Sequence, residues 1–205
     1  KNPLTPMKLS IQHLHMRWSS FDNVEKTERF GTFAQNLIQQ IDTLSAIANE
    51  FSSFAKLPET SFSKIDLTEI ISSSVDVYNG TDDVMVSFES DIALFVIGDK
   101  DQMLRVFNNL IKNAIQAIPN NKKGIVRVYT ILENDLLKII VEDNGKGISK
   151  DNYSRIFVPN FTTKSSGMGL GLAMVQKILE NMGGTIYFLS EENKGTKFII
   201  ELSTK

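Results

Sequence analysis

The first third of the chain carries apolar residues at alternating steps of three and four. One stripe runs over residues 4–21 and a second over residues 30–54, with a polar break at 22–25 between them. These are heptad a and d positions, which predict two helices that each bury one side against a partner helix. The stripes consist of Leu4, Met7, Ile11, Leu14, Trp18 and Phe21, then Phe30, Phe33, Leu37, Gln40, Leu44, Ile47, Phe51 and Phe54.

Two helices joined by a short loop form an antiparallel hairpin, which has too little core to stand alone. Two hairpins from two chains bury both stripes in a four-helix bundle, so the pattern predicts a homodimer. The alternative is a single hairpin that packs on the rest of its own chain.

After Pro58 the pattern changes to short elements that alternate between helix and strand periods. Strands that pair mainly through hairpins, with three helices on one face, make a two-layer sandwich, so the predicted fold class is α+β. The expected organisation is a helical hairpin over 1–57, a linker over 58–64 and an α/β sandwich over 65–205. Helices are predicted over 67–75, 103–117 and 170–181, and strands over 84–88, 94–97, 125–132, 136–143, 185–189 and 196–202.

Composition excludes several classes of protein. The 205 residues include no cysteine, which removes disulfide frameworks, thiol catalysis and cysteine-rich metal sites. The net charge is −2, from 22 basic and 24 acidic side chains that are interspersed, so neither nucleic acid nor an anionic membrane is indicated as a partner. No apolar run is long enough to span a bilayer. We therefore expect a cytoplasmic chain, with any membrane anchor of a parent protein in upstream segments.

Glycines gather late in the chain, where eight of the 12 fall between Gly145 and Gly195. No P-loop motif occurs, and GMGLG at 167–171 is followed by Leu172, so the Rossmann spacing fails. This run precedes the predicted helix 170–181, and free backbone N–H groups at a helix start bind phosphate. The segment 149–169 is expected to be a mobile lid that carries Phe157, Phe161, Thr162, Thr163 and Lys164.

Asp143 ends a predicted strand whose inward face, by period two, also carries Leu137, Ile139 and Val141. A carboxylate on that face needs a hydrogen-bond donor. The exocyclic amine of adenine would supply one, whereas guanine would present an acceptor there and be repelled. The alternative is an aspartate that caps a turn.

Asn109 and Asn113 lie four residues apart, on one side of the predicted helix 103–117. Amide oxygens are hard, neutral ligands, and Mg²⁺ needs few of them when phosphates and water supply the rest. The alternative is a pair of solvated asparagines. Together these candidates describe an ATP site without a P-loop.

Five segments, in this order, resemble the conserved boxes of the sensor histidine kinases. The resemblance covers residues 65–203 and implies the Bergerat ATP-binding fold, which the Hsp90, gyrase and MutL ATPases share. The segments are Asn109-Leu-Ile-Lys-Asn113 (N box), Asp143-Asn-Gly-Lys-Gly147 (G1 box), Phe157-Val-Pro-Asn-Phe-Thr-Thr-Lys164 (F box), Gly167-Met-Gly-Leu-Gly-Leu172 (G2 box) and Gly195-Thr-Lys-Phe198 (the last glycine box).

The resemblance implies that Asp143 binds adenine and that Asn113 holds Mg²⁺. Asn109 and Lys164 are implied in catalysis. Gln116 departs from the family, in which many members carry a lysine toward phosphate at this position, and Lys112 or Lys164 would substitute for it. The residues implied at the nucleotide are Asn109, Asn113, Asp143, Gly145, Gly147, Phe161, Thr162, Thr163, Lys164, Gly167, Gly169, Leu170, Gly171, Leu172 and Thr196.

The predicted hairpin resembles the dimerisation and phosphoacceptor domain of the same kinases. Residues 1–7 (KNPLTPM) are similar to the continuation of their H box, His-Glu-x-x-Asn-Pro-Leu, and residues 51–58 (FSSFAKLP) to the nitrogen-regulation, NtrY-type subgroup. In that register the acceptor histidine lies three residues before Lys1, and neither His13 nor His15 matches it. Asn2 matches a position linked to phosphatase activity, where it would orient a water molecule and act in catalysis.

The sequence therefore predicts the catalytic core of a sensor histidine kinase. Such an enzyme binds ATP and Mg²⁺, phosphorylates a histidine, and passes the phosphoryl group to an aspartate of a response-regulator receiver domain. This chain is expected to bind ATP and dimerise without phosphorylating itself. The alternatives are a non-catalytic, nucleotide-gated interaction module and a chaperone- or repair-type ATPase of the same fold.

Overall fold

The structure is a computed structural model that describes residues 9–12, 23–55, 61–78, 83–90, 93–163 and 169–204. The chain divides into two compact units, residues 1–56 and 57–205. No helix within the described residues combines the length and the apolar character that a bilayer crossing needs.

The described part of the first unit is α2 (Asn23–Ala55), a helix of 33 residues, and a helical segment at 9–12. The helix begins earlier than the sequence indicates, because residues 23–25 belong to it and not to the predicted break. Phe30, Ile38 and Ile41 are 50–58% exposed. Most of the other helix of the predicted hairpin lies outside the described residues, so the hairpin stays a prediction. The half-buried side chains described on α2 are four of the predicted stripe, Phe33, Leu37, Gln40 and Leu44, and the neighbouring Ala34.

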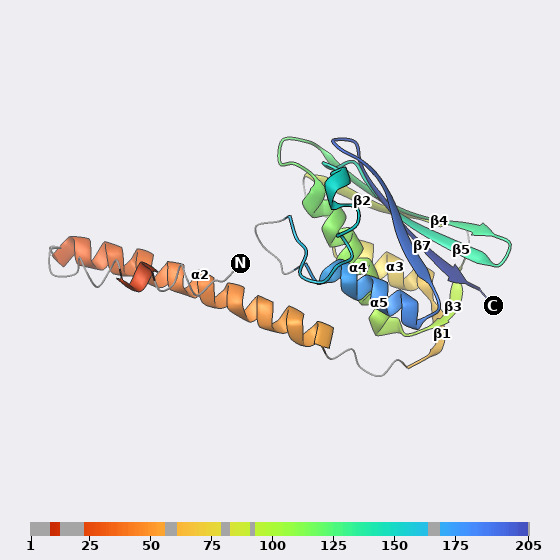
Figure 1. Ribbon diagram of the computed structural model, residues 1–205, viewed down its shortest axis with the longest axis horizontal. Coiled ribbons are helices and arrows are strands. Elements are labelled where there is room, and N and C mark those ends of the chain that lie inside the picture. The colour runs from red at the N-terminus through yellow and green to blue at the C-terminus, as the bar shows by residue number, and fades with distance from the viewer. Residues whose placement is uncertain are drawn as a thin grey trace. The chain divides into compact units, whose positions relative to one another are not determined.

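The second unit is a two-layer α+β sandwich, as predicted, with helices on one face of a five-stranded sheet (Figure 1). Within the described residues these helices are α3 (Leu67–Asp76), α4 (Lys100–Ala117) and α5 (Gly171–Asn181). The strand order is β2-β4-β5-β7-β6. The strands are β2 (Val84–Glu89), β4 (Gly124–Glu133), β5 (Leu136–Asp143), β6 (Thr185–Glu191) and β7 (Gly195–Ser203).

The expectation that strands pair mainly through hairpins is wrong. β4–β5 and β6–β7 are hairpins, but β2 pairs parallel with β4 and β5 pairs antiparallel with the distant β7. The parallel pair needs a crossover connection, which α4 provides. The long-range pair brings Asp143 opposite Thr196, and this pairing builds one end of the site.

The sequence also missed β1 (Ser63–Asp66), which pairs antiparallel with β3 (Phe95–Gly98) in a separate two-stranded ribbon. β1 begins inside the predicted linker 58–64. Its four residues include one buried apolar side chain, Ile65, so no alternating pattern was long enough to read.

The core of the second unit lies between the sheet and the helices. Val128 on β4, Ile139 on β5 and Ile200 on β7 point inward and are fully buried. α4 faces them with fully buried Phe107 and Leu110. This packing fixes α4 against the central strands, which end at the site.

Candidate functional site

Asp143 is the buried carboxylate at the end of β5. It is 5% exposed and shares the inward face with Leu137, Ile139 and Val141, as the sequence predicted. Its Oδ1 accepts a hydrogen bond from the Gly145 backbone N–H at 2.8 Å, and the Thr196 backbone N–H also donates to the carboxylate. Burial raises the pKa of Asp143 to about 6, and these two bonds offset only part of the rise. A further donor from a ligand would stabilise the ionised form.

The turn after β5 is held against the end of α4 and the β6–β7 turn. The Lys146 N–H donates to the Ala117 carbonyl at 2.9 Å, and a Cβ at Gly145 would lie 2.6 Å from the same oxygen. Gly147 has a φ of +68°, and a Cβ there would lie 2.2 Å from the Glu191 carbonyl oxygen. Both glycines therefore permit close backbone approach, and they place Asp143 at the C-terminal end of α4.

Ser190 lies at the Asp143 end of the site and was not predicted from the sequence. Its Oγ accepts from the Ile148 N–H at 2.9 Å, donates to the Gly195 carbonyl at 3.0 Å and lies 2.9 Å from the Thr196 Oγ1. The Tyr153 hydroxyl donates to the Ser190 carbonyl. The signal was available, because alternation along β6 puts Ser190 on the inward side, near the hairpin turn. Thr196 thus supports Asp143 through its backbone and is itself fixed through its hydroxyl.

Asn109 and Asn113 are half-buried, one turn apart on α4. The Asn109 side-chain amide donates to the Arg105 carbonyl at 2.8 Å. A Cβ at Gly171 would lie 2.6 Å from the Asn109 Oδ1, so α4 meets the first turn of α5 here. Asn109 of the predicted pair and Gly171, the last glycine of the predicted run, are therefore brought together.

The residue that precedes α5 does not cap the N-terminus of this helix. α3 and α4 begin with aspartates that accept hydrogen bonds from their first-turn N–H groups, whereas the residue before α5 is Leu170, which has no polar side chain to do so. The first N–H groups of a helix lack partners within the helix and carry positive potential, so this end suits an anion. Leu170 is buried and fills the core, and Leu172 is half-buried.

The first half of the predicted lid packs on the sheet. After η2 (Lys150–Asn152), Ile156 is buried and the Tyr153 ring meets the Phe188 ring edge-on, with centroids 4.9 Å apart. Tyr153 therefore contacts β6 through its ring, and the lid motion of this segment stays a prediction.

The second half of the segment begins at Phe161. The Arg155 guanidinium lies 4.5 Å above the centre of the Phe161 ring. Gly169, with a φ of +69°, brings its backbone against the Phe161 carbonyl, which lies 2.1 Å from where a Cβ would be. Thr162 and Thr163 are exposed. Of the other predicted residues, Asn2, Lys164 and Gly167 lie outside the described residues.

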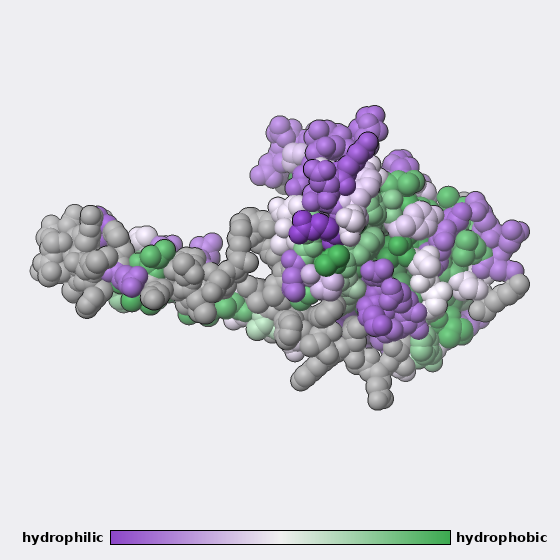
Figure 2. Space-filling view, in the orientation of Figure 1, coloured by the Kyte–Doolittle hydropathy of each residue, from purple (hydrophilic) through white to green (hydrophobic). Residues whose placement is uncertain are grey.

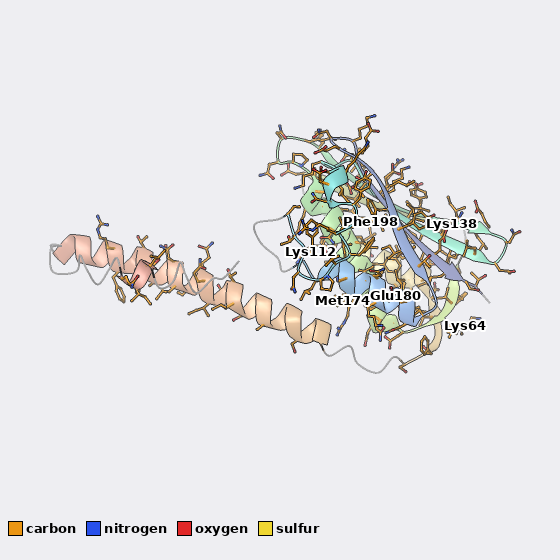
Figure 3. All side chains as sticks on the ribbon, in the orientation of Figure 1. Lys64, Lys112, Lys138, Met174, Glu180 and Phe198 are labelled. Atoms are coloured by element: carbon orange, nitrogen blue, oxygen red, sulfur yellow. The ribbon has the colours of Figure 1, made fainter. Side chains whose placement is uncertain are left out.

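The surface around the site is polar. Figure 2 shows hydrophilic residues gathered over the end of the second unit where the loop before β4, η2 and the β6–β7 turn lie in Figure 1. Lys112, proposed to replace the family lysine, is exposed on α4 (Figure 3). A separate hollow between α5 and β6 is lined by Gln176, Glu180 and Thr185. It lies at the other end of β7 from Thr196 and includes no predicted site residue.

The described residues fit a nucleotide. A buried carboxylate with spare acceptor capacity lies at the end of α4. Farther back along α4, the Asn109 amide lies beside the N-terminus of α5, which Leu170 does not cap. Residues 98–205 match the profile of the histidine kinase-, DNA gyrase B- and HSP90-like ATPases. The chain belongs to this ATPase family.

Relatives within this nucleotide-binding family are sensor kinases, which confirms the predicted resemblance. Over its whole length the chain is 30% identical to a protein of Rickettsia felis that is named as an NtrY-like sensor histidine kinase, of which it covers 34%. It is 35% identical to the sensor histidine kinase ZraS of Escherichia coli strain K12, over 82% of this chain and 37% of ZraS. The chain spans about a third of the length of these curated relatives.

A solved structure supports the same assignment. The catalytic domain of the histidine kinase ThkA is 30% identical and superposes with a TM-score of 0.63, over 70% of this chain and 96% of that domain. The second unit therefore has the fold of a histidine kinase ATPase domain.

Proposed function

We propose that the second unit binds ATP with Mg²⁺ and donates the γ-phosphoryl group to a histidine upstream of Lys1, from which it passes to a response-regulator aspartate. The observation that carries the proposal is Asp143, a buried carboxylate whose protein donors do not fully offset its burial. Its position at one end of α4, with the N-terminus of α5 farther along that helix, suits a ligand with a base at one end and an anion at the other.

The predicted nucleotide-site residues have the following roles in this proposal. Asp143 accepts from the adenine amine, with Gly145, Gly147 and Thr196 around it. Asn113 holds Mg²⁺ with Asn109 beside it, and the backbone of Gly169, Leu170, Gly171 and Leu172 donates to the phosphates, while Phe161, Thr162, Thr163 and Lys164 cover them. Mg²⁺, when bound, neutralises phosphate charge, so the protein mainly positions the reactants.

The transfer itself is balanced. The bond between the γ-phosphorus and the bridging oxygen breaks and leaves ADP, while a new bond forms between phosphorus and an imidazole nitrogen, which loses its proton. Neutral imidazole is available near pH 7, because its ordinary pKa is about 6.5.

A chain extended upstream through the His-Glu segment tests the proposal. Incubated with γ-labelled ATP and Mg²⁺, it should acquire an acid-labile, alkali-stable label, and Asn113→Ala should lose it. ATP binding without any label would favour the nucleotide-gated module, and sustained ATP hydrolysis without a phosphoprotein would favour a chaperone- or repair-type ATPase.

We also propose that the first unit forms a homodimer through a helical hairpin, over about residues 1–57 with a linker at 58–64. Phe30, Ile38 and Ile41 are large apolar side chains left at least half exposed on α2, and a second hairpin would cover such a face. Leu37→Lys should convert the dimer into a monomer in sedimentation analysis, whereas Gln39→Lys, at an exposed polar position, should leave it dimeric. A dimeric Leu37→Lys variant would contradict the proposal.

A further inference from the structure

Arg105 carries a buried donor with no hydrogen-bond partner. Its Nη1 is shielded from solvent and bonds to no atom of the described residues. A guanidinium has five N–H donors and a permanent charge, so a buried donor without an acceptor is energetically costly. Buried polar groups are rarely left unpaired in native proteins, and each exception needs an explanation.

Arg105 lies next to the proposed phosphate end of the site. It is one helical turn before Asn109, and its carbonyl accepts the Asn109 side-chain amide at 2.8 Å. This bond directs the amide group toward Arg105 and leaves the Asn109 Oδ1 facing Gly171, at the start of α5.

Distances along the axis of α4 give the length of the proposed site. The turn that follows Asp143 meets the Ala117 carbonyl through Gly145, and Asn109 comes eight residues before Ala117, which is about 12 Å along the helix axis. Arg105 follows about 6 Å farther on. An extended nucleoside triphosphate has a comparable length, so a base at Asp143 directs its last phosphate toward the stretch between Asn109 and Arg105.

The helix α5 runs alongside this stretch. Its first residue, Gly171, meets Asn109, and Met182, just after its end, meets Gly98 just before α4. The two helices are therefore antiparallel, and Arg105 lies beside the first turns of α5. A guanidinium on this stretch of α4 adds positive charge to that of the N-terminus of α5, and both favour an anion.

We propose that the Arg105 guanidinium binds the terminal phosphate of the nucleotide and stabilises the phosphoryl group during transfer. This inference rests on the proposed function and deepens it. It also supplies a cation for a site in which the family lysine is replaced by Gln116. A planar guanidinium presents two parallel donors that match two phosphate oxygens, whereas a lysine ammonium acts as a point charge.

Nucleotide affinities of the 205-residue chain test the inference without any turnover. Dissociation constants for ADP and for a non-hydrolysable ATP analogue, both with Mg²⁺, should be compared among the unsubstituted chain, Arg105→Gln and Arg105→Lys. Arg105→Gln should weaken analogue binding about tenfold or more and leave ADP binding within about twofold. The affinity of Arg105→Lys for the analogue should lie between those of the unsubstituted chain and Arg105→Gln. Lysine keeps the positive charge but lacks the two parallel donors of the guanidinium. Arg127→Gln is the matched control, since Arg127 is exposed and pairs with Glu142.

A second measurement uses the unsubstituted chain, so it does not depend on how a variant folds. The guanidinium NMR resonances of Arg105 should shift when the analogue is added and not when ADP is added. Equal losses of affinity for both nucleotides, or no change in either, would overturn the inference and leave the proposed function standing. Failure of the unsubstituted chain to bind either nucleotide would overturn both.

Discussion

Asp99 and Asp143 are both buried aspartates, yet the protein treats their charges differently. Asp99 precedes α4, where its Oδ1 accepts from the Gln102 N–H at 3.0 Å and its Oδ2 accepts from the Ser61 N–H at 2.9 Å. Each oxygen thus has a backbone donor, and the carboxylate lies at the positive end of a helix. The protein alone satisfies Asp99.

Asp143 lies at the end of a strand, with no helix N-terminus at hand. Two backbone donors reach it, but desolvation outweighs them and its pKa rises to about 6. At neutral pH the fold therefore holds an ionised group at a cost in stability. Burial is similar at the two positions, so burial alone does not distinguish a structural carboxylate from a ligand-binding one. Each has two backbone donors, and the difference is the helix N-terminus beside Asp99, which Asp143 lacks.

The largest expected effect is that of Asp143→Asn on nucleotide binding. The amide presents its own donor toward the adenine amine, so the affinity should fall by about 10- to 100-fold, as for a lost hydrogen bond to a charged group. At the same time the variant should be more stable than the unsubstituted chain at pH 7, by up to about 3 kcal/mol, because the cost of ionising a buried carboxyl disappears. Calorimetric titration and urea unfolding measure the two effects. A less stable variant with intact binding would show that Asp143 is structural, like Asp99.

The pH dependence of binding should follow the same carboxyl group. Its folded pKa, about 6, lies above the ordinary value of 3.8, so the free protein binds a proton as the pH falls below 6. If the nucleotide needs the ionised form, affinity is full above pH 6 and falls about tenfold per pH unit below it. The stability of the free protein should change in the opposite direction, because the contribution of this group to the free energy of unfolding increases as the pH falls from 6 to 4. Asp143→Asn is the control, and its weak affinity should not vary over this range.

Local periodicity predicted the parts of the site that lie within one element. The stripe of α4 placed Asn109 and Asn113 on one side, and alternation along β5 placed Asp143 inward; both follow from spacing of 3.6 and 2 residues. The pairing of β5 with β7 was not predicted, because residues far apart in the sequence carry no local signal of their contact. Without that pairing the Thr196 donor to Asp143 and the role of Ser190 stay hidden.

Asp99 and Arg105 show a second limit. Neither stood out in the sequence, since an aspartate before a helix and an arginine within one are ordinary. Their significance depends on a count of donors and acceptors in three dimensions. That count gives Asp99 two partners from segments far apart in the chain and leaves one Arg105 nitrogen with none.

The smallest expected effect is that of Asp99→Ala, which tests the structural aspartate of the pair. Asp99→Ala removes the cap of α4 and the bond to the Ser61 N–H, so the second unit should lose about 1 kcal/mol of stability, within the 0.5–2 kcal/mol typical of a lost cap. Urea unfolding should show a lower midpoint with an unchanged slope. Nucleotide affinity should stay as it was, because Asp99 lies at the opposite end of α4 from Asp143. Asp101→Ala is the matched control, since Asp101 is exposed in the first turn of the same helix. If Asp99→Ala weakened binding as strongly as Asp143→Asn, the division between a structural and a ligand-binding aspartate would fail.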